Sequence, residues 1–355
     1  MTPPDIEAVA TLLSEAVAAR VTPGAVVQVG TAAAPRWTLA AGHVTYAAGA
    51  GLVTPVTVYD LGSLTKVLAT TALAMRHAAV GTLPLETALA DRFPQCAGQP
   101  RVTVADLLEH AAGLPAHRPF YREVAGRSGY LARIAHEPPT YAPRSAHEYT
   151  DLGFILLGLL VEQAGGMSLA AQFDAFVADA LGPAEVAFGV REGWRGRVAP
   201  TAVSAWRGRM LVGRVHDDNA AALGGAAGHA GLFGTASAVG GFARWYLTLW
   251  QRSVIVSAGV TAAQAARFAT RGMVPGSSRA LGWDTMLPTS SCGRLLSPRA
   301  IGHTGFTGTS LWIDPDRDLY IVMLTNRVHA GGDANGDGIR ALRIALHTAV
   351  ASEWR

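Results

Sequence analysis

Lysine is almost absent from this chain of 355 residues, and this scarcity makes the single copy informative. Of the 29 basic residues, only Lys66 is a lysine, and all the others are arginines. An arginine guanidinium keeps its proton near neutral pH, whereas a lysine ammonium can lose its proton when burial or a neighbour lowers its pKa. Lys66 is therefore a candidate for a site at which a side chain must give up or accept a proton.

Cysteine, long apolar runs and clustered charge are also scarce. Cys96 and Cys292 are the only cysteines, so there is no disulfide framework, and we expect two free buried thiols. No apolar run of about eighteen residues suggests a membrane span. The net charge of +3 comes from scattered arginines, which predicts no nucleic-acid partner. No signal peptide is visible, so we expect a cytoplasmic protein, or a periplasmic or extracellular one if an export signal was removed.

A serine stands three residues before the lysine. Residues 60–66 read Asp-Leu-Gly-Ser-Leu-Thr-Lys, and apolar residues then recur at helical spacing until Gly81. The spacing predicts a helix with Ser63 in its first turn and Lys66 one turn later on the same face. A neutral Lys66 amine could take the Ser63 proton, and the positive end of the helix dipole would stabilise the alkoxide. The alternative is an N-capping serine beside a surface lysine.

Strand-like segments lie at both ends of the chain, with helical patterns between them. The predicted strands are 25–29, 37–40, 281–284, 310–313 and 319–324. The clearest helices are predicted at 5–20, 152–164 and 338–351. This order predicts an α/β (α+β) protein with a discontinuous sheet domain, residues 1–69 and 246–355, and an inserted helical domain, residues 70–245.

Two further motifs lie far from Ser63 in the sequence. Tyr149-Thr150-Asp151 precedes the helix predicted at 152–164, so Asp151 could also be its N-cap and Tyr149 a core aromatic. The run at 302–309, Gly-His-Thr-Gly-Phe-Thr-Gly-Thr, leads into a strand and could be a simple turn. The histidines lack zinc-protease spacing, and the chain has no Gly-x-Ser-x-Gly or Gly-x-Gly-x-x-Gly motif. We therefore expect no metal and no cofactor.

Taken together, the three motifs resemble the active-site elements of the serine β-lactamase and penicillin-binding protein superfamily. Their order and spacing are similar to those of class C β-lactamases, low-molecular-weight penicillin-binding-like peptidases and related esterases. Two other stretches share this resemblance, which covers nearly the whole chain. They are residues 106–115 and the pair 215–220 and 228–233, in which His216 and Asp217 could line a cleft.

The resemblance implies an antiparallel sheet flanked by helices, beside an all-helical domain, with the active site in the cleft between them. It implies that Ser63 is the acylated nucleophile and that Lys66 and Tyr149 share the general-base and general-acid work. The backbone N–H groups of Ser63 and Phe306 would form the oxyanion hole. The residues implied to bind substrate are Asp151, His303, Thr304 and Gly305.

Two residues depart from the pattern of that superfamily. Asp151 stands where the better-known members have Asn, and an ionised carboxylate near Lys66 would favour the ammonium form. Which of Lys66 and Tyr149 takes the first proton therefore stays open. His303 replaces a lysine that supplies a fixed positive charge. An imidazole with a pKa near its usual value of about 6.5 is only partly charged at neutral pH, which predicts weaker, pH-dependent recognition of a substrate carboxylate.

These observations predict a serine acyl hydrolase that forms an acyl-enzyme on Ser63. The expected substrates are D-alanyl peptides or related cell-wall amides, with β-lactams as slow substrates or inhibitors. A carboxylesterase for small acyl esters is the alternative on the same site. A non-catalytic binder of peptidoglycan fragments is the alternative outside the enzymes, because Asp151 and His303 both change residues that act on substrate. The partner is in each case a small molecule or peptide, and the oligomeric state stays open.

Overall fold

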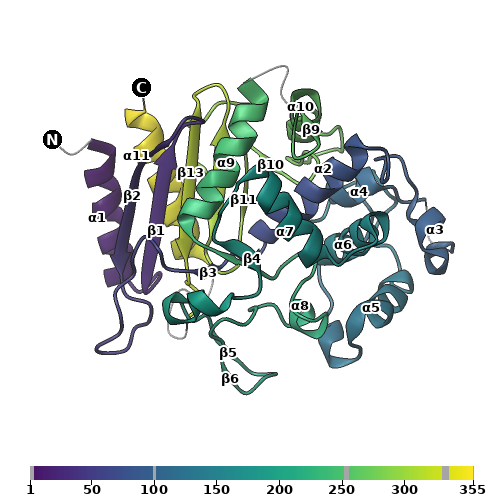
Figure 1. The fold of residues 1–355 in the computed structure, drawn as a ribbon, viewed down its shortest axis with the longest axis horizontal. Helices are drawn as coiled ribbons and strands as arrows, with labels where there is room; N and C mark the ends of the chain where they lie inside the picture. Colours follow the sequence, from purple (N-terminus) through teal and green to yellow (C-terminus); the bar gives the residue numbers. More distant parts are fainter. Residues whose placement is uncertain (1–3, 99–100, 252–255, 330–335, 355) are drawn as a thin grey trace.

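The computed structural model describes residues 4–98, 101–251, 256–329 and 336–354. A six-stranded sheet forms one side of the molecule, and short helices with long connections form the other side (Figure 1). The strand order is β10-β11-β12-β13-β1-β2, and every neighbouring pair is antiparallel. The predicted fold class, a mixed protein with an antiparallel sheet and flanking helices, is confirmed.

The sheet is built from the two ends of the chain. Its strands are β1 (Gly24–Gly30), β2 (Pro35–Gly42), β10 (Asp284–Thr285), β11 (Ile301–Thr304), β12 (Ser310–Asp314) and β13 (Leu319–Thr325). The centre is the pairing of β1 with β13, in which Val26 lies opposite Leu324. Both strands are buried along their whole length, which explains their nearly continuous apolar sequence.

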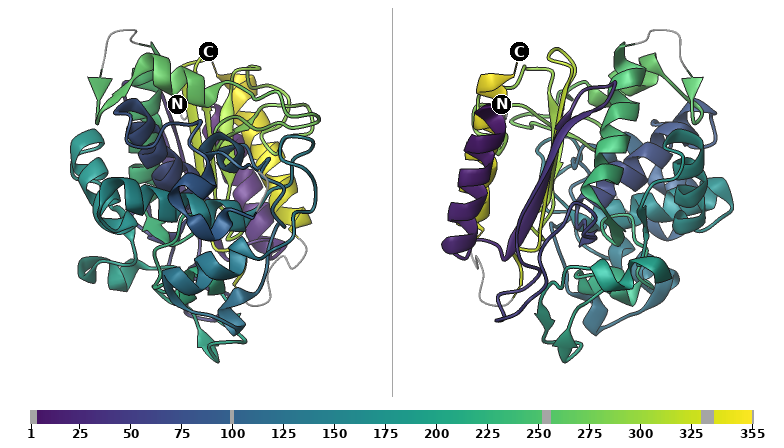
Figure 2. Two further views of the ribbon diagram at one scale, coloured as in Figure 1. Left: turned by 90° about the vertical axis from the view of Figure 1, so that its right-hand side faces the viewer. Right: turned by 60° about the vertical axis from the view of Figure 1, so that its left-hand side comes forward.

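Helices cover both faces of this sheet. α1 (Pro4–Ala18) and α11 (Asp337–Glu353) pack together on one face, and α9 (Ala236–Gln251) lies across the other (Figure 2). The side chains of β1 alternate between the two layers. Val27 and Val29 pack with α1 and α11, whereas Val26 joins the larger core on the opposite face.

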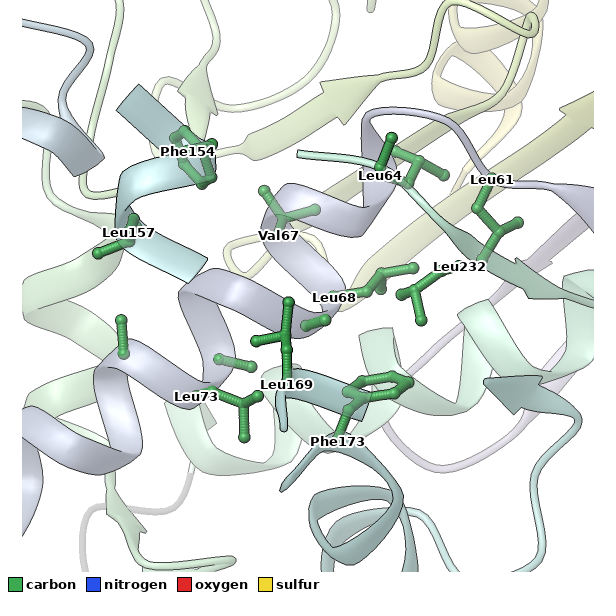
Figure 3. Close-up of a cluster of buried hydrophobic side chains, with 14 of the residues drawn as sticks. Leu61, Leu64, Val67, Leu68, Leu73, Phe154, Leu157, Leu169, Phe173 and Leu232 are labelled. Atoms are coloured by element: carbon green, nitrogen blue, oxygen red, sulfur yellow. The ribbon is translucent and has the colours of Figure 1, made fainter. Parts of the chain in front are cut away.

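The larger core lies between the sheet and the helical part of the chain (Figure 3). The helices of this part are η1 (Lys66–Thr71), α2 (Ala72–Ala79), α3 (Leu89–Arg92), η2 (Pro94–Cys96), α4 (Val104–Leu108), η3 (Phe120–Arg122), α5 (Gly126–Ala135), α6 (Asp151–Gly165), α7 (Leu169–Ala180), η4 (Glu192–Arg197) and α8 (Asp218–Ala222). α10 (Ala262–Ala269) follows α9. A small sheet joins β3 (Tyr59–Asp60), β7 (Leu232–Gly234) and β4 (Val186–Phe188). Two short hairpins complete the list: β5 (Val203–Ser204) with β6 (Arg209–Met210), and β8 (Val256–Ser257) with β9 (Val260–Thr261).

Most predicted elements are confirmed within one or two residues, and the strand at 281–284 is the main error. Leu281 and Trp283 are buried, as a strand would require, but Gly282 adopts a φ of +86° that breaks the extended backbone. Strand β10 begins only at Asp284. Cys96 and Cys292 are buried and unpaired, as expected.

The division into two domains stays a proposal, and the position of α9 refines it. The predicted boundary between residues 245 and 246 falls inside α9, which contacts β1 and β13. We propose that α9 belongs with the sheet, so that the inserted helical part ends before Ala236.

No single helix in the described ranges is both long enough and apolar enough to cross a membrane. By length and composition alone, α6 and α7 pass as a bent pair, with 73° between them. Most residues of α6 are buried in the protein core.

Candidate active site

Ser63 lies in a tight turn between β3 and η1. Gly62 has a φ of +54°, and a Cβ on it would lie 3.0 Å from Thr307 Oγ1, so both the backbone and the space favour glycine. The buried carboxylate of Asp60 accepts the Gly62 N–H at 2.9 Å and the His216 N–H at 2.6 Å. Ser63 is thereby fixed at the start of a helix whose first turns widen into a π-helix over Lys66–Thr71, a distortion frequent at functional sites.

Lys66 is completely buried and directs its ammonium group at three acceptors. Nζ lies 3.0 Å from Ser63 Oγ, 2.8 Å from Asp151 Oδ1 and 3.2 Å from the His229 carbonyl oxygen. An ammonium has three N–H donors, so this geometry satisfies the charged form completely. Burial alone would lower the pKa of Lys66, but the Asp151 carboxylate more than offsets it and raises the pKa. The contact between Ser63 and Lys66 that the sequence predicted is therefore present. Without substrate, however, the pairing with Asp151 favours the ammonium form of Lys66 over the neutral amine that would act as a base.

Asp151 is the first residue of α6. The sequence had allowed it to be the N-cap of this helix, but it is not. The N-cap is Thr150, whose hydroxyl accepts the Gly153 N–H at 3.4 Å. This leaves the Asp151 carboxylate free to pair with Lys66 and to approach His117 Nδ1 at 3.7 Å. Burial would raise the pKa of Asp151, but Lys66, His117 and His229 together hold it well below its usual range. The same carboxylate raises the pKa of the half-exposed His117.

The turn after β11 lies directly against the Ser63 turn. Thr307 Oγ1 donates to the Asp60 carbonyl at 2.9 Å, and Thr309 Oγ1 donates to the Leu61 carbonyl at 2.8 Å. Gly305 makes this approach possible, because a Cβ there would lie 2.1 Å from Thr309 Oγ1. The backbone N–H groups of Ser63 and Phe306 donate to no protein acceptor in the described part of the chain. Two adjacent unused donors beside the serine are what a developing oxyanion would need.

Tyr149 lies between charged and neutral side chains. Its ring centroid is 4.9 Å from Lys66 Nζ and 5.2 Å from the guanidinium carbon of Arg279. The rings of His110 and His303 lie 4.6 Å and 5.8 Å from it. Tyr149 is therefore part of the site, where it lines both cavities described below, and is not simply a core aromatic.

Hydrogen bonds fix the tautomers of the two histidines beside Tyr149. His303 Nδ1 lies 2.9 Å from the Thr304 carbonyl, which can only accept, so the proton is on Nδ1 and Nε2 carries a lone pair. His110 Nδ1 accepts the Thr150 N–H at 3.1 Å, so His110 is protonated on Nε2. Burial, Arg279 and Lys66 hold the pKa of both histidines well below the usual value. His303 is thus neutral, where the sequence predicted a partly charged ring.

Two cavities open on either side of Ser63, and both are lined by Ser63, Tyr149 and Phe306. The first, of about 310 Å³, contains His303, Thr304 and Gly305 together with three arginines, Arg279, Arg327 and Arg343. Arg327 donates to the Phe306 carbonyl, and Arg343 donates to the carbonyls of Gly305 and Thr309. Within the described ranges Arg279 makes no ion pair with a carboxylate. Asp284, its backbone partner across an isolated β-bridge, lines the same cavity, and its carboxylate accepts the Ser278 hydroxyl at 2.5 Å.

The second cavity, of about 440 Å³, lies on the Asp151 side of Ser63. Its wall includes His216 and Asp217, for which the sequence allowed either a place in a cleft or a loop-stabilising role; Asp217 also caps α8 by accepting the Ala220 N–H at 2.7 Å. Asp217 Oδ1 lies 2.8 Å from Nε2 of His229, whose carbonyl accepts from Lys66. The exposed ring of Phe306, which lines both cavities, stacks on His216 with centroids 5.7 Å apart.

A family model described as "Beta-lactamase" matches residues 9–346. The chain belongs to the beta-lactamase family. The "Putative D-alanyl-D-alanine carboxypeptidase" of Escherichia coli (strain K12) is 30% identical over 308 residues, which cover 77% of this chain and 70% of that protein. Relatives of the same name from Salmonella gallinarum and Salmonella agona are 30% and 29% identical.

Two solved structures share the fold of this beta-lactamase family protein. EstCE1, "a hydrolase with promiscuous acyltransferase activity", superposes with a TM-score of 0.76 at 20% identity and covers 98% of each chain. A class C beta-lactamase from Rhodobacter sphaeroides superposes with a TM-score of 0.73 at 21% identity, covering 97% of this chain and 99% of its own.

The sequence motifs located the centre of the site but missed its surroundings. Arg279 lies in a Gly- and Ser-rich loop with no motif, and only the register of that loop beside β10 brings it to Tyr149. His110 lies within residues 106–115, which carry the family resemblance, but the sequence did not show that its ring packs 4.6 Å from that of Tyr149. His117 and His229 approach Asp151 and Lys66 only through the packing of the loop after α4 and the loop before β7.

Proposed function

We propose that this protein is a serine acyl hydrolase that forms an acyl-enzyme on Ser63 and acts on D-alanyl peptides or related cell-wall amides. The observation that carries the proposal is the hydrogen bond of 3.0 Å between Ser63 Oγ and the buried Lys66 Nζ, beside two unused backbone amides. A serine that only capped a helix would need neither a buried lysine nor free donors.

In the proposed reaction, Ser63 Oγ bonds to the carbonyl carbon of the substrate as its hydroxyl proton passes to the base. The carbonyl oxygen becomes negatively charged and accepts hydrogen bonds from the amides of Ser63 and Phe306. The amide C–N bond then breaks, and the leaving amine takes a proton from the general acid. Water attacks the resulting ester by the same steps in reverse, which releases the acid and restores the Ser63 hydroxyl.

Lys66 and Tyr149 are the residues proposed to move these protons, and Asp151 controls the order in which they act. Lys66 can accept the Ser63 proton only as a neutral amine, and Asp151 holds it as an ammonium ion. The ion pair must therefore loosen before Lys66 acts as the base. His117 competes for the same carboxylate, and so would a substrate that contacts Asp151.

A substrate with a free carboxylate fits the first cavity. Arg279 presents a guanidinium there that keeps its charge at any relevant pH, whereas His303 is neutral. We assign recognition of the carboxylate to Arg279, with Thr304 and Gly305 lining the same wall and His303 as a neutral hydrogen-bond acceptor. This modifies the sequence-based expectation of weak, pH-dependent recognition by His303. The names of the curated relatives agree with a carboxypeptidase.

Three substrates separate the candidate functions. The protein is incubated with a penicillin, a p-nitrophenyl ester and a peptide ending in D-Ala-D-Ala, and intact mass and product release are followed, with Ser63→Ala as the control. Release of D-alanine and a slow penicilloyl adduct, both absent from Ser63→Ala, are the expected results. Absence of any adduct or turnover in the folded protein, together with a measurable affinity for a peptidoglycan fragment, would instead identify a binder.

A carboxylesterase is the second candidate, and the neutral state of His303 favours it. A small uncharged ester needs no cation in the first cavity, and the exposed Phe306 ring offers an apolar surface at its mouth. Rapid ester turnover without D-alanine release would support this function in place of the carboxypeptidase.

A further inference from the structure

The β5–β6 hairpin projects from the body of the protein. It lies at the lower edge of Figure 1 and extends beyond the rest of the chain in both views of Figure 2. Of the twelve large hydrophobic side chains that are exposed within the described ranges, four belong to this short segment. They are Val203, Trp206, Met210 and Val212, with exposed fractions between 36% and 57%.

The polarity of the hairpin is inverted relative to an ordinary surface strand. Val203 and Met210 are cross-strand partners and point outward, and Val212 continues the same face two residues later. Ser204, on the opposite face, is buried against the protein, and so is Leu211. A surface hairpin normally places its apolar face inward, so an apolar stripe that faces solvent indicates something else to contact.

The apolar stripe is held rigidly. Arg207 has only 11% of its side chain exposed and donates to the carbonyls of Val215 and His216, each at 2.7 Å. It also pairs with Asp218 at 2.6 Å and contacts Ser204 Oγ at 3.3 Å. These bonds connect the tip of the hairpin to its base, so the apolar side chains are presented in a fixed arrangement.

Positive charge lies next to the stripe and not on it, because Arg209 is the cross-strand partner of Ser204 on the face opposite Val203 and Met210. Residues 200–215 contain three arginines and no acidic residue. Arg207 is neutralised by Asp218, but no carboxylate in the described part of the chain lies within ion-pairing distance of the exposed Arg209 and Arg214. The segment therefore combines two unpaired cations with aromatic and aliphatic side chains at a projecting tip.

We propose that the β5–β6 hairpin is a contact site for an anionic phospholipid bilayer. Val203, Met210 and Val212 would enter the boundary between headgroups and acyl chains, Trp206 would lie at the level of the headgroups, and Arg209 and Arg214 would bind lipid phosphates. A bilayer suits this surface better than a folded protein, because a stable protein interface buries about 800 Å² per partner and a two-stranded tip offers far less.

The hairpin is also connected to the second cavity of the candidate active site. Trp206 packs against Tyr121, with ring centroids 5.0 Å apart, and Tyr121 lines that cavity. A bilayer bound to the tip would therefore lie near a wall of the second cavity. The proposal concerns binding alone and does not depend on the proposed hydrolase activity.

Flotation with lipid vesicles tests the proposal. The full chain is mixed with vesicles of phosphatidylcholine alone or of phosphatidylcholine with phosphatidylglycerol, at low and high salt. We expect binding to the anionic vesicles that weakens at high salt. Arg209→Glu/Arg214→Glu should weaken it at least about 20-fold, since each arginine near the surface contributes about a factor of five. Val203→Ser/Met210→Ser should weaken it about tenfold or more.

Matched controls lie elsewhere on the surface. Arg267→Glu reverses an exposed arginine on α10, and Met273→Ser removes the most exposed methionine, and both should bind as the unchanged protein does. Hydrolysis of a small soluble ester should be the same in Arg209→Glu/Arg214→Glu as in the unchanged protein. The proposal is overturned if the chain ignores anionic vesicles, if it binds neutral and anionic vesicles equally, or if the hairpin variants bind no worse than the controls.

Discussion

Asp151 stands where the better-known related enzymes have asparagine, and replacing it tests how Lys66 is held in its charged form. We predict that Asp151→Asn makes the acylation of Ser63 faster at neutral pH. Without the carboxylate, burial dominates the environment of Lys66 and favours the neutral amine that can take the Ser63 proton. The asparagine amide also restores a donor that can bind the carbonyl oxygen of a substrate.

The size of the effect follows from the geometry of the ion pair. Lys66 is fully buried and Asp151 has 21% of its side chain exposed, at an N–O distance of 2.8 Å. Two unit charges about 4 Å apart attract by about 4 kcal/mol at an effective dielectric constant of about 20. If half of this attraction returns as a larger fraction of neutral Lys66, the rate rises about 30-fold.

The assay is the pH dependence of kcat/KM for a p-nitrophenyl ester, which reports the ionisation of the free enzyme. Asp151→Asn should move the rise of activity to lower pH. Asp217→Asn is the matched control, because Asp217 lines the same cavity but pairs with His229 instead of Lys66. A folded Asp151→Asn protein that loses activity at every pH, with the profile unmoved, would refute this reasoning and make Asp151 a required group.

Stability provides an independent check on the same pair. The pKa of Asp151 is lowered by folding, so its contribution is present above the unfolded value of 3.8 and is lost as the pH falls through the folded value. The pKa of Lys66 is raised, so its contribution is present below 10.5 and is lost as the pH rises through the folded value. In Asp151→Asn, burial lowers the pKa of Lys66, so the variant itself becomes more stable as the pH rises from that lowered value to 10.5. The difference in unfolding free energy between the unchanged protein and Asp151→Asn should therefore be constant from pH 3.8 up to the lowered pKa of Lys66 and shrink on both sides of this range.

Three further predictions concern the other parts of the site. Arg279→Gln should raise KM for a peptide with a free C-terminal carboxylate about 10- to 100-fold and leave a neutral ester unaffected, as steady-state kinetics would show; an equal loss for both would contradict carboxylate recognition. Gly305→Ala should abolish acylation and lower the melting temperature, because its Cβ would lie 2.1 Å from Thr309 Oγ1. The control is Gly241→Ala in α9, whose Cβ would meet nothing within 4 Å and which should be neutral or stabilising. Lys66→Arg should fold by circular dichroism but fail to acylate by intact mass, because a guanidinium does not release its proton; substantial activity would remove the argument from deprotonation.

The sheet could be predicted well because its strands carry their own signals. Residues 319–324 are a continuous apolar run, and residues 25–29 are apolar except for Gln28; they form the two fully buried central strands. The turn at 314–318 and the stop of α6 at Gly166 are set by local residue chemistry. The prediction of a strand at 281–284 was wrong because Gly282 changes the direction of the backbone in an otherwise strand-like segment.

In the candidate site, too, the contacts between residues close in the sequence could be predicted, whereas those between distant residues could not. Ser63 and Lys66 are three residues apart, so their contact follows from the helical spacing alone. The pairing of Lys66 with Asp151 spans 85 residues, and the motif could place them in one cleft without saying that they form an ion pair. The roles of Tyr149, Phe306 and the substrate-binding residues stay predictions that the proposed experiments test.

The two departures from the related enzymes act on one ring, and each makes its surroundings less positive by one charge. A lysine at position 303 would bring a further cation next to Tyr149, which already lies near Lys66 and Arg279. With a neutral histidine there, that cation is absent, and Asp151 neutralises Lys66 on the other side. Arg279, in the first cavity, has no carboxylate within ion-pairing distance in the described part of the chain. Asp151→Asn and His303→Lys each add one positive charge beside Tyr149, so the double variant should change the electrostatics of Tyr149 more than either single variant. A double-mutant cycle would measure the coupling between the two positions.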